Sequence, residues 1–208
     1  MKKRVFLLIL FFILINLSRN FQLINSSDQG RIIVELEDSE CNLYFKQGWN
    51  LFSFCKNLRN TDLEEVFSPL KDKFRYIMRW NTTSQKFDIY SKRSIEKPFT
   101  KLDDNESYFI YMYEEANISI KGDEVRDEKR YLVRGWTAPS YQLGFSTSIE
   151  EVLKNVYENF RYIMKWNTTS QKFDIYSKRS IEKPFKTINK GEGQFIYMEN
   201  NSIIEYKT

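Results

Sequence analysis

The chain has 208 residues, of which 32 are lysine or arginine and 28 are aspartate or glutamate, so its net charge at pH 7 is +4. The two signs of charge are interleaved rather than gathered into a basic stripe, which argues against nucleic acid as a partner. The chain has no histidine and two cysteines, which removes the commonest general base and excludes a four-ligand thiolate zinc site. We therefore expect no metal and no cofactor.

The N-terminus has the pattern of an export signal. Three basic residues at 2–4 precede an unbroken apolar run over 5–15, in the order that is typical of a signal peptide. The run is shorter than the about 20 residues of a membrane span, but no small-x-small cleavage site follows it. We interpret residues 1–20 as a signal peptide or an uncleaved N-terminal anchor, and residues 21–40 as a lead-in. Either interpretation predicts a secreted or cell-surface protein, with membrane contact only through an uncleaved anchor.

The rest of the chain contains an internal repeat. Residues 75–99 recur at 161–185 with one change in 25, Arg79 becoming Lys165. A spacing of 86 residues predicts two copies of one small folding unit. The predicted boundaries are a first unit at 41–122, a linker at 123–129 and a second unit at 130–208. The 13 tyrosines and 17 phenylalanines suit the interiors of small β-rich units.

The two cysteines lie at the start of the first unit. A hairpin with the loop Gln47-Gly48-Trp49 would place Cys41 opposite Cys55. Directly opposite strand residues have Cα atoms about 4.5–5.5 Å apart, which is within disulfide range, and an exported protein permits the bond. The alternative is two free buried thiols. The second unit has Glu128 and Gln142 near these places, so the fold does not depend on such a bridge.

A short helix is predicted next in each unit. Asp62 precedes the run Leu63-Glu64-Glu65-Val66-Phe67, with Glu65 three residues on, in the form of a capping box. Ser148 and Glu151 repeat this spacing in the second unit.

The repeated segment predicts a β-hairpin. A four-residue loop over 82–85 pairs Trp80 with Phe87 and Met78 with Ile89, an apolar side that we expect to face the interior of the unit. On the other side Arg79 faces Asp88. The second copy places Lys165 opposite Asp174, so the single change keeps a positive charge opposite the aspartate. The predicted fold class is α+β, mainly β, with two tandem small antiparallel β-sheet or barrel units that each carry one short helix.

A family resemblance follows from three motifs. These are Gly48-Trp49-Asn50-Leu51-Phe52-Ser53-Phe54, the strand YIMRWN at 76–81 and the strand YFIYM at 108–112. With them, most of residues 41–208 resembles the Gly-Trp-Asn-Leu repeat modules of exported archaeal and bacterial surface proteins. The resemblance implies structural or adhesive modules without an assigned activity, and it carries over no binding residue. The second unit departs from the motif at Thr137-Ala138-Pro139, where proline predicts an edge strand or a break.

The favoured function is a non-catalytic secreted or cell-surface structural or interaction protein, with an unknown surface partner or a glycan. Two copies of a weak contact raise avidity without new chemistry. The candidate interaction face is the outer side of the hairpin, which could equally be a packed or solvated outside of a sheet. Its residues are Arg75, Ile77, Arg79, Asp88 and Tyr90 with Arg161, Ile163, Lys165, Asp174 and Tyr176.

Three other functions remain open. A pair of carbohydrate-binding modules would use Trp49 and Trp136, at turns, as sugar-stacking residues, while the hairpin pairing places Trp80 and Trp166 inside. A carboxylate-based hydrolase needs two acids about 5–10 Å apart, for which Asp88 and Glu96 are a possible pair, but an enzyme is disfavoured. A structural spacer is the third.

Six Asn-x-Ser/Thr triplets are candidate glycosylation sites. They begin at Asn25, Asn81, Asn105, Asn117, Asn167 and Asn200. Asn81 is expected at a hairpin tip, where a sugar would be exposed, although asparagine also suits a turn.

Overall fold

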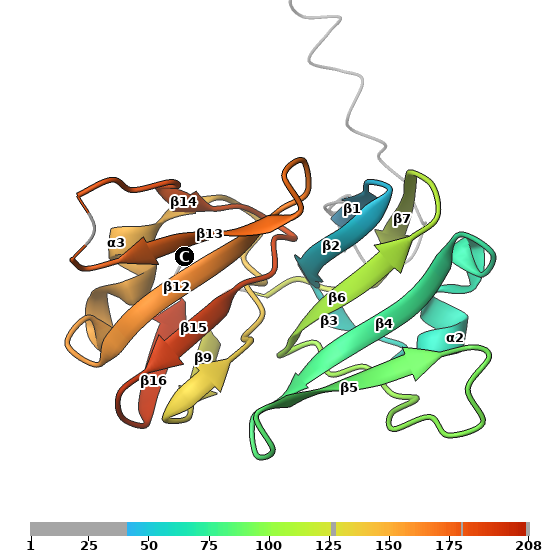
Figure 1. Cartoon of the computed structure of the whole chain (residues 1–208), viewed down its shortest axis with the longest axis horizontal. Helices are drawn as coiled ribbons and strands as arrows, with labels where there is room; N and C mark the ends of the chain where they lie inside the picture. Colours follow the sequence, from blue (N-terminus) through green and yellow to red (C-terminus); the bar gives the residue numbers. More distant parts are fainter. Residues whose placement is uncertain (1–40, 126–127, 180, 207–208) are drawn as a thin grey trace, which may run out of the picture. The chain divides into compact units, whose positions relative to one another are not determined.

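The computed structural model describes residues 41–125, 128–179 and 181–206 (Figure 1). The predicted signal segment at 1–20, the lead-in at 21–40 and the triplet at Asn25 lie outside the described residues. The described chain is mainly β, with antiparallel strand pairs and a few short helices. Among the residues searched, no helix is long and apolar enough to cross a membrane. We call residues 41–125 the first half and residues 128–206 the second half.

The first half is built on a four-stranded antiparallel sheet, the first sheet, in the order β2-β6-β4-β5. Its strands are β2 (Gly48–Ser53), β4 (Phe74–Asn81), β5 (Lys86–Ser91) and β6 (Ser107–Met112). Two further pairs join β1 (Cys41–Phe45) to β7 (Ala116–Ile120) and β3 (Asn57–Leu58) to β8 (Gly122–Asp123).

The second half has a second sheet with the corresponding order β10-β15-β12-β13. Its strands are β10 (Gly135–Thr137), β12 (Phe160–Asn167), β13 (Lys172–Ser177) and β15 (Phe195–Met198). Two further pairs join β9 (Glu128–Leu132) to β16 (Ser202–Tyr206) and β11 (Thr147–Ser148) to β14 (Thr187–Ile188). The edge strand β10 is three residues long and ends before Ala138-Pro139, where the sequence predicts a break.

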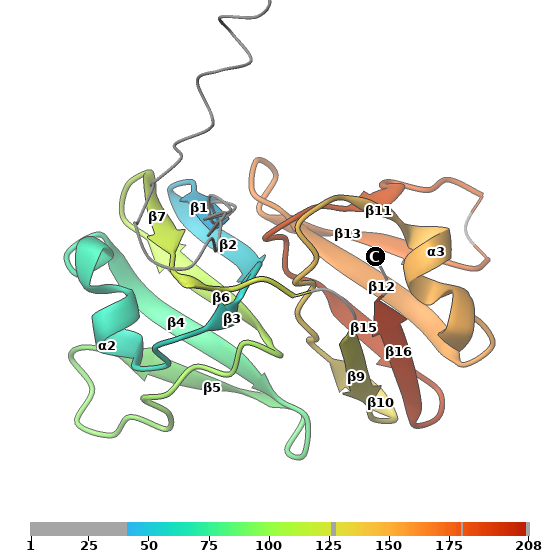
Figure 2. The ribbon, with the colours of Figure 1, turned by 180° about the vertical axis from the view of Figure 1, so that it is seen from behind.

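Each half carries its short helix on one face of its sheet (Figure 2). Helix α2 (Leu63–Val66) begins after Asp62, whose carboxylate accepts from the backbone N–H groups of Glu64 and Glu65 at 3.1 and 3.2 Å. Helix α3 (Ile149–Leu153) begins after Ser148, whose hydroxyl accepts from the N–H of Glu151 at 3.2 Å. A single 3₁₀ turn extends each helix, at Ser68–Leu70 and Lys154–Val156. The predicted caps are confirmed.

The predicted hairpin register is confirmed in both halves. Trp80 pairs with Phe87 and Arg79 with Asp88 in β4 and β5, and Lys165 pairs with Asp174 in β12 and β13. The prediction of which side faces the interior is wrong. Ile77 and Tyr90, on the side predicted to face outward, are fully buried in the core formed with α2, whereas Phe87 and Ile89 are 37% and 47% exposed.

The predicted disulfide is present, but it does not close a hairpin. Cys41 and Cys55 are bonded, with their Cα atoms 5.8 Å apart. Strand β1 pairs with β7, and strand β2 pairs with β6, so the hairpin predicted over 41–55 is wrong. The bond therefore joins the β1–β7 pair to the segment that follows the edge strand of the first sheet. A disulfide indicates an oxidising, exported environment.

Candidate functional site

The predicted interaction face does not form one surface. Four of its members are core residues: Ile77, Ile163 and Tyr90 are 0% exposed and Tyr176 is 5% exposed. The expectation that these four side chains face outward is wrong, because the helix of each half covers that side of the sheet. The Tyr90 hydroxyl also donates to the Glu64 carboxylate of α2 at 2.8 Å, which ties the hairpin to the helix.

The charged members of that face occupy three different environments. Arg75 and Arg161 are exposed, and their guanidinium groups lie 4.9 and 5.3 Å from the ring centres of the adjacent Tyr76 and Tyr162. Arg79 forms a half-buried ion pair with Asp88 at 3.1 Å. Lys165 and Asp174 do not repeat that pair, since the Lys165 ammonium contacts Glu192 and Asp174 accepts from the Asn167 amide at 3.2 Å.

The candidate sugar-stacking residues lie in equivalent aromatic groups. Trp49 is half-buried and stacks on Tyr76 with ring centres 6.4 Å apart and planes 14° apart. Trp136 is half-buried and stacks on Tyr162 at 6.4 Å and 19°. Tyr111 and Tyr197 meet these indoles edge to face at 5.1 Å. Each indole therefore has only part of its surface open to a ligand.

The backbone of each of these tryptophans is bound by the hairpin of the other half. The Trp80 Nε1–H donates to the Trp136 carbonyl at 2.9 Å, and the Gln85 side-chain amide donates to the same carbonyl at 3.0 Å. The Trp136 N–H donates to Gln85 Oε1 at 2.9 Å. A tryptophan and a glutamine from one hairpin thus satisfy both backbone groups of one residue.

The opposite contact is made in the same way. The Trp166 Nε1–H donates to the Trp49 carbonyl at 2.8 Å, and Gln171 forms both amide bonds to the Trp49 backbone, at 2.8 and 3.1 Å. Reciprocal use of one patch by two similar units is the pattern of an isologous interface. We call these two sets of bonds the reciprocal contacts.

Glycine before each tryptophan is required for the reciprocal contacts. Gly48 and Gly135 have φ values of +92° and +101°, which L side chains rarely adopt. A Cβ at either position would also lie 2.9 Å from the glutamine Oε1 of the other half. The Gly-Trp motif is therefore explained by contact between the halves as well as by the local turn.

An aromatic cluster lies between the two sheets, which we call the shared aromatic cluster. Phe109, Ala138 and Phe195 are buried in it. The partly buried members are Trp49, Leu51, Met78, Trp80, Trp136, Met164, Trp166 and Phe173. Phe109 meets the Trp166 ring at 5.2 Å and Phe195 meets the Trp80 ring at 5.7 Å, both edge to face. The apolar side of the predicted hairpin thus packs against the other half.

Two backbone junctions flank this cluster. At the first, which we call the Glu192 junction, Phe52 bridges to Glu192 and the Ser53 N–H donates to the Gly191 carbonyl at 3.0 Å. The Lys165 ammonium forms an ion pair with Glu192 and donates to the Thr187 carbonyl at 3.1 Å. The Glu192 carboxylate also accepts from the Asn189 backbone and side-chain N–H groups, each at 2.9 Å. This carboxylate is fully partnered.

At the second, the Glu106 junction, Glu106 bridges to Pro139 and the Ser140 N–H donates to the Asn105 carbonyl at 2.8 Å. Glu106 Oε2 is buried and has no hydrogen-bond partner. Burial, with a smaller contribution from the Asp103 carboxylate, raises the pKa of the Glu106 carboxyl to about 7. A cavity of about 400 Å³ lies beside it, lined by Trp80, Thr82, Asp103, Asn105, Glu106, Lys129, Arg130, Tyr131, Thr137, Ala138 and Pro139.

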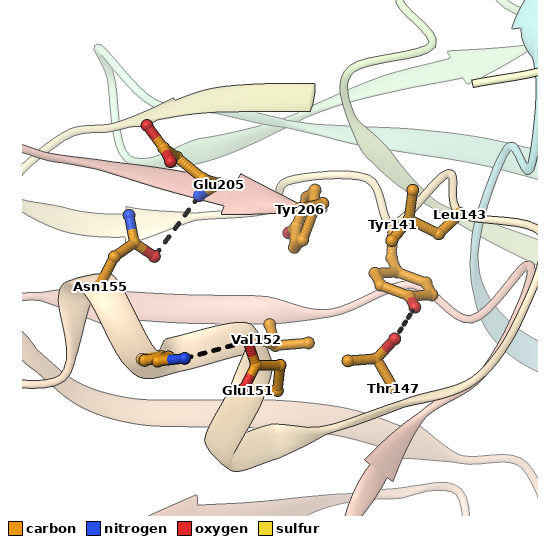
Figure 3. Close-up of a pocket in the computed structure, with 9 residues that line it drawn as sticks. Tyr141, Leu143, Thr147, Glu151, Val152, Asn155, Glu205 and Tyr206 are labelled. Atoms are coloured by element: carbon orange, nitrogen blue, oxygen red, sulfur yellow. Dashed lines mark hydrogen bonds and ion pairs between the residues drawn. The ribbon is translucent and has the colours of Figure 1, made fainter. Parts of the chain in front are cut away.

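A smaller cavity of about 240 Å³ lies in the second half between α3 and β16 (Figure 3). Its polar groups bind one another, as the Tyr141 hydroxyl lies 2.5 Å from Thr147 Oγ1 and Asn155 Oδ1 accepts from the Glu205 N–H at 3.5 Å. Glu205 also forms an ion pair with Lys129 at 2.9 Å. This cavity therefore has fewer groups available to a ligand than the cavity at Glu106.

The remaining site candidates are placed as follows. Asp88 is paired with Arg79, and Glu96 lies on an exposed loop, so the acids named for a hydrolase have different surroundings. Within the part of the chain that the structure describes, no group of three acids, cysteines or histidines is arranged to hold a metal ion.

Five glycosylation candidates lie within the described residues. Asn105, Asn117 and Asn200 are exposed. Asn81 and Asn167 are half-buried, and their side-chain carbonyls accept from the two N–H groups at positions +2 and +3 of the hairpin loop, at 3.0 to 3.1 Å. These two asparagines serve the turn, as the alternative interpretation of Asn81 proposed.

The residues that connect the two halves have no predicted role. The sequence places Gln85 in a hairpin loop and gives no role in binding to Gln171, Glu106 or Glu192. A signal was present, since both pairs are separated by the 86-residue spacing of the repeat. That spacing marks equivalent positions, but it does not reveal that they bind each other's half.

Comparison with known proteins adds no identity. No protein-family model, curated protein or solved structure matches the chain. The resemblance to Gly-Trp-Asn-Leu repeat modules therefore stays a prediction.

Proposed function

We propose that this chain is a non-catalytic secreted or cell-surface protein, structural or adhesive, that presents one surface loop twice. The loop comprises residues 92–98, and the described part of its copy comprises residues 178–179 and 181–184; we call these the repeated loops. The observation that carries the proposal is that Ile95 and Ile181, at equivalent places in them, are fully exposed. A fully exposed isoleucine makes no contribution to its own core, and its presence at the same place in both loops gives the chain two equivalent apolar contact points.

Both repeated loops are held at their ends by lysines. In the first, the Lys92 ammonium lies 4.4 Å from the Phe74 ring centre and Lys97 forms an ion pair with Glu64 at 2.6 Å. In the second, Lys178 lies 5.3 Å from the Phe160 ring centre and Lys183 lies 4.3 Å from the Tyr176 ring centre. These contacts hold the ends of each loop, and Ile95 and Ile181 lie exposed between them.

Export is the second part of the proposal. The Cys41–Cys55 disulfide supports an oxidising compartment, and the charged and apolar pattern at residues 2–15 supports a signal peptide or anchor. The reciprocal contacts support a two-module unit in which the repeated loops have a fixed separation. Such an arrangement favours simultaneous binding to two equal sites, where avidity can exceed a single affinity by about 10²–10⁴.

The test is binding of the fluorescently labelled full chain to intact cells that produce it, measured by flow cytometry. We expect Ile95→Ser and Ile181→Ser each to lower the apparent affinity at least tenfold, and the double variant to abolish binding. Ile203→Ser is the matched control, since Ile203 is 40% exposed but lies on β16. Equal binding by the double variant and the native chain would refute the proposal.

Glycan binding is a second candidate, favoured by the two half-exposed groups formed by Trp49 with Tyr76 and by Trp136 with Tyr162. Sugar rings would stack on the open part of each indole. Titration with neutral oligosaccharides should then change the tryptophan fluorescence. A spectrum that stays constant up to millimolar sugar would reject this candidate.

A further inference from the structure

The two junctions are built from equivalent residues. Glu106 and Glu192 are 86 positions apart, as are Arg79 and Lys165, and as are Phe99 and Phe185. Each glutamate bridges to the third residue after the tryptophan of an edge strand: Glu192 to Phe52, after Trp49, and Glu106 to Pro139, after Trp136. The Glu192 junction can therefore be used to show what the Glu106 junction lacks.

At the Glu192 junction a primary ammonium group fills the space beside the glutamate. The Lys165 side chain is 15% exposed, and its ammonium contacts the Glu192 carboxylate. It also donates to the Thr187 carbonyl at 3.1 Å and lies 5.2 Å from the Phe185 ring centre. Carboxylate, carbonyl and aromatic face together form a complete ammonium site.

At the Glu106 junction the equivalent basic residue, Arg79, pairs with a different carboxylate. The Arg79 guanidinium lies 4.7 Å from the Phe99 ring centre, as Lys165 does over Phe185, but it forms its ion pair with Asp88 at 3.1 Å. A guanidinium is planar and binds a carboxylate in a fixed geometry, whereas an ammonium is a compact point charge. Glu106 Oε2 is consequently left without a partner.

A second unpartnered polar group lines the same cavity. Thr137 is 7% exposed, and its hydroxyl has no hydrogen-bond partner. The residue at the corresponding place in the first half, Asn50, donates to the Lys46 and Gly48 carbonyls at 2.7 and 3.1 Å. Buried polar groups without partners are rare in folded proteins and point to a missing ligand or water.

The other charged groups around the cavity have partners other than Glu106. Asp103 binds the Asn105 backbone and side-chain N–H groups through one oxygen, at 2.9 and 2.7 Å. Lys129 is paired with Glu205, and Arg130 donates to Ser140 and Gln142. Trp80 and Tyr131 provide aromatic wall.

We propose that the cavity at the Glu106 junction binds a small organic molecule through its primary ammonium group, in the position that the Lys165 side chain fills at the Glu192 junction. The volume of about 400 Å³ is in the range of small-molecule sites. Hydroxyl and amide groups of Thr82, Thr137 and Asn105 line the same space. Amino sugars and short aliphatic polyamines share the ammonium chemistry that this site recognises.

The proposal predicts a pH dependence with a defined sign. An ammonium binds the ionised carboxylate of Glu106, whose pKa is raised to about 7 by burial. About a tenth of the carboxyl is ionised at pH 6 and about nine tenths at pH 8, so the affinity for 1,4-diaminobutane, whose amines stay protonated across this range, should rise about tenfold between these values. Asp103 and Asp88 raise this pKa further and Arg79 lowers it, and Lys129 and Arg130 also line the cavity.

The test is isothermal titration calorimetry of the full chain at pH 8 with glucosamine and with 1,4-diaminobutane. Glucose and N-acetylglucosamine are the uncharged controls. Binding of glucosamine alone identifies an amino sugar site, and binding of the diamine identifies a polyamine site; either result supports the proposal if the uncharged controls do not bind. Binding of the uncharged controls with equal affinity, or no binding by either amine, would overturn it.

Two variants make the test specific. Glu106→Gln should weaken amine binding at least tenfold, and Arg79→Lys should do the same, because it restores the internal ammonium that fills the equivalent site. Glu192→Gln is the matched control and should bind the amine as the native chain does. Retention of full affinity by Glu106→Gln would contradict the proposal, and thermal melting of each variant establishes that it is folded.

Discussion

The Glu192 junction and the Glu106 junction have the same backbone bridge and the same flanking serine bonds, but the carboxylates of their glutamates have different partners. Glu192 receives the Lys165 ammonium and two N–H groups from Asn189, whereas one oxygen of Glu106 is buried and unpartnered beside a cavity. The basic residue is the only difference within the 25-residue repeat. A second difference lies outside the repeat, where Asp103 stands at the position equivalent to Asn189 and has no side-chain N–H to donate. The exchange of lysine for arginine removes the cation from the glutamate, and the exchange of asparagine for aspartate removes a donor.

The reciprocal contacts are alike on both sides. Trp80 with Gln85 and Trp166 with Gln171 bind the Trp136 and Trp49 backbones at 2.8 to 3.1 Å. The comparison therefore separates two contributions: packing and backbone bonding, which the halves share, and charge pairing, which they do not. The following variants test that separation.

The largest effect is expected for the tryptophans of the reciprocal contacts. Trp80→Ala and Trp166→Ala each remove a half-buried indole from the shared aromatic cluster and one hydrogen bond. Each should lower the free energy of unfolding by about 2–4 kcal/mol, measured by urea denaturation. Tryptophan to phenylalanine at the same positions is the control and should cost about 1 kcal/mol. A difference of more than twofold between the two alanine variants would show that the reciprocal contacts are not equivalent.

The second-largest loss of stability is expected when the Lys165 ammonium is removed. Lys165→Met leaves the Glu192 carboxylate in a partly buried place without its cation. Breaking a buried ion pair on one side costs about 3–5 kcal/mol, and partial exposure of Glu192 reduces the expected loss to about 2 kcal/mol at pH 8. The double variant Lys165→Met, Glu192→Gln should recover most of that loss. If it does not, the methionine destabilises by packing and the ion pair is unimportant.

Glu106→Gln should raise the free energy of unfolding instead of lowering it, and the gain should depend on pH. The folded pKa of this carboxyl is raised from 4.5 to about 7, so the folded state binds the proton more tightly. The native chain then loses stability as the pH rises from about 4.5 to about 7 and is level above that. At about 1.4 kcal/mol per pH unit, and with the exposed part of the side chain discounted, Glu106→Gln should be more stable by about 1–2 kcal/mol at pH 8 and unchanged at pH 4. Stability curves that run parallel across this range would exclude a perturbed Glu106.

The smallest effect is expected for the glutamines. Gln85→Ala and Gln171→Ala each remove two hydrogen bonds to a tryptophan backbone near the surface, where water can replace them. A loss of about 1 kcal/mol each is expected, and the losses should add in the double variant because the two sites share no bonded group. Differential scanning calorimetry of the four proteins gives this comparison, and a double variant as stable as either single variant would be inconsistent with two independent contacts.

The sequence predicted the local structure well because local rules decide it. The four-residue loops fixed the pairing of Trp80 with Phe87, and Asp62 and Ser148 marked the starts of both helices. It also predicted the Cys41–Cys55 disulfide. That prediction came from a hairpin that does not form, because strand β2 pairs with β6 and not with β1. Sequence proximity of two strands was outweighed by a longer-range pairing.

The face of the hairpin that contacts the core could not be decided from its alternation. Both faces are rich in apolar residues: Ile77 and Tyr90 lie on one, and Met78, Trp80 and Phe87 lie on the other. The first packs on the helix and the second packs on the other half. A face that is buried by a second module has the same composition as a core face, so only the three-dimensional arrangement separates them.

The contrast between the two junctions is tested by the pKa of the Glu106 carboxyl, measured by ¹³C NMR titration in the native chain and in Arg79→Lys. We expect a value near 7 in the native chain and a lower value in Arg79→Lys, because the new ammonium can pair with the carboxylate as Lys165 pairs with Glu192. Equal values in the two proteins, or an ordinary value in the native chain, would contradict the claim that the basic residue at position 79 or 165 decides whether the glutamate of its junction is paired with a cation.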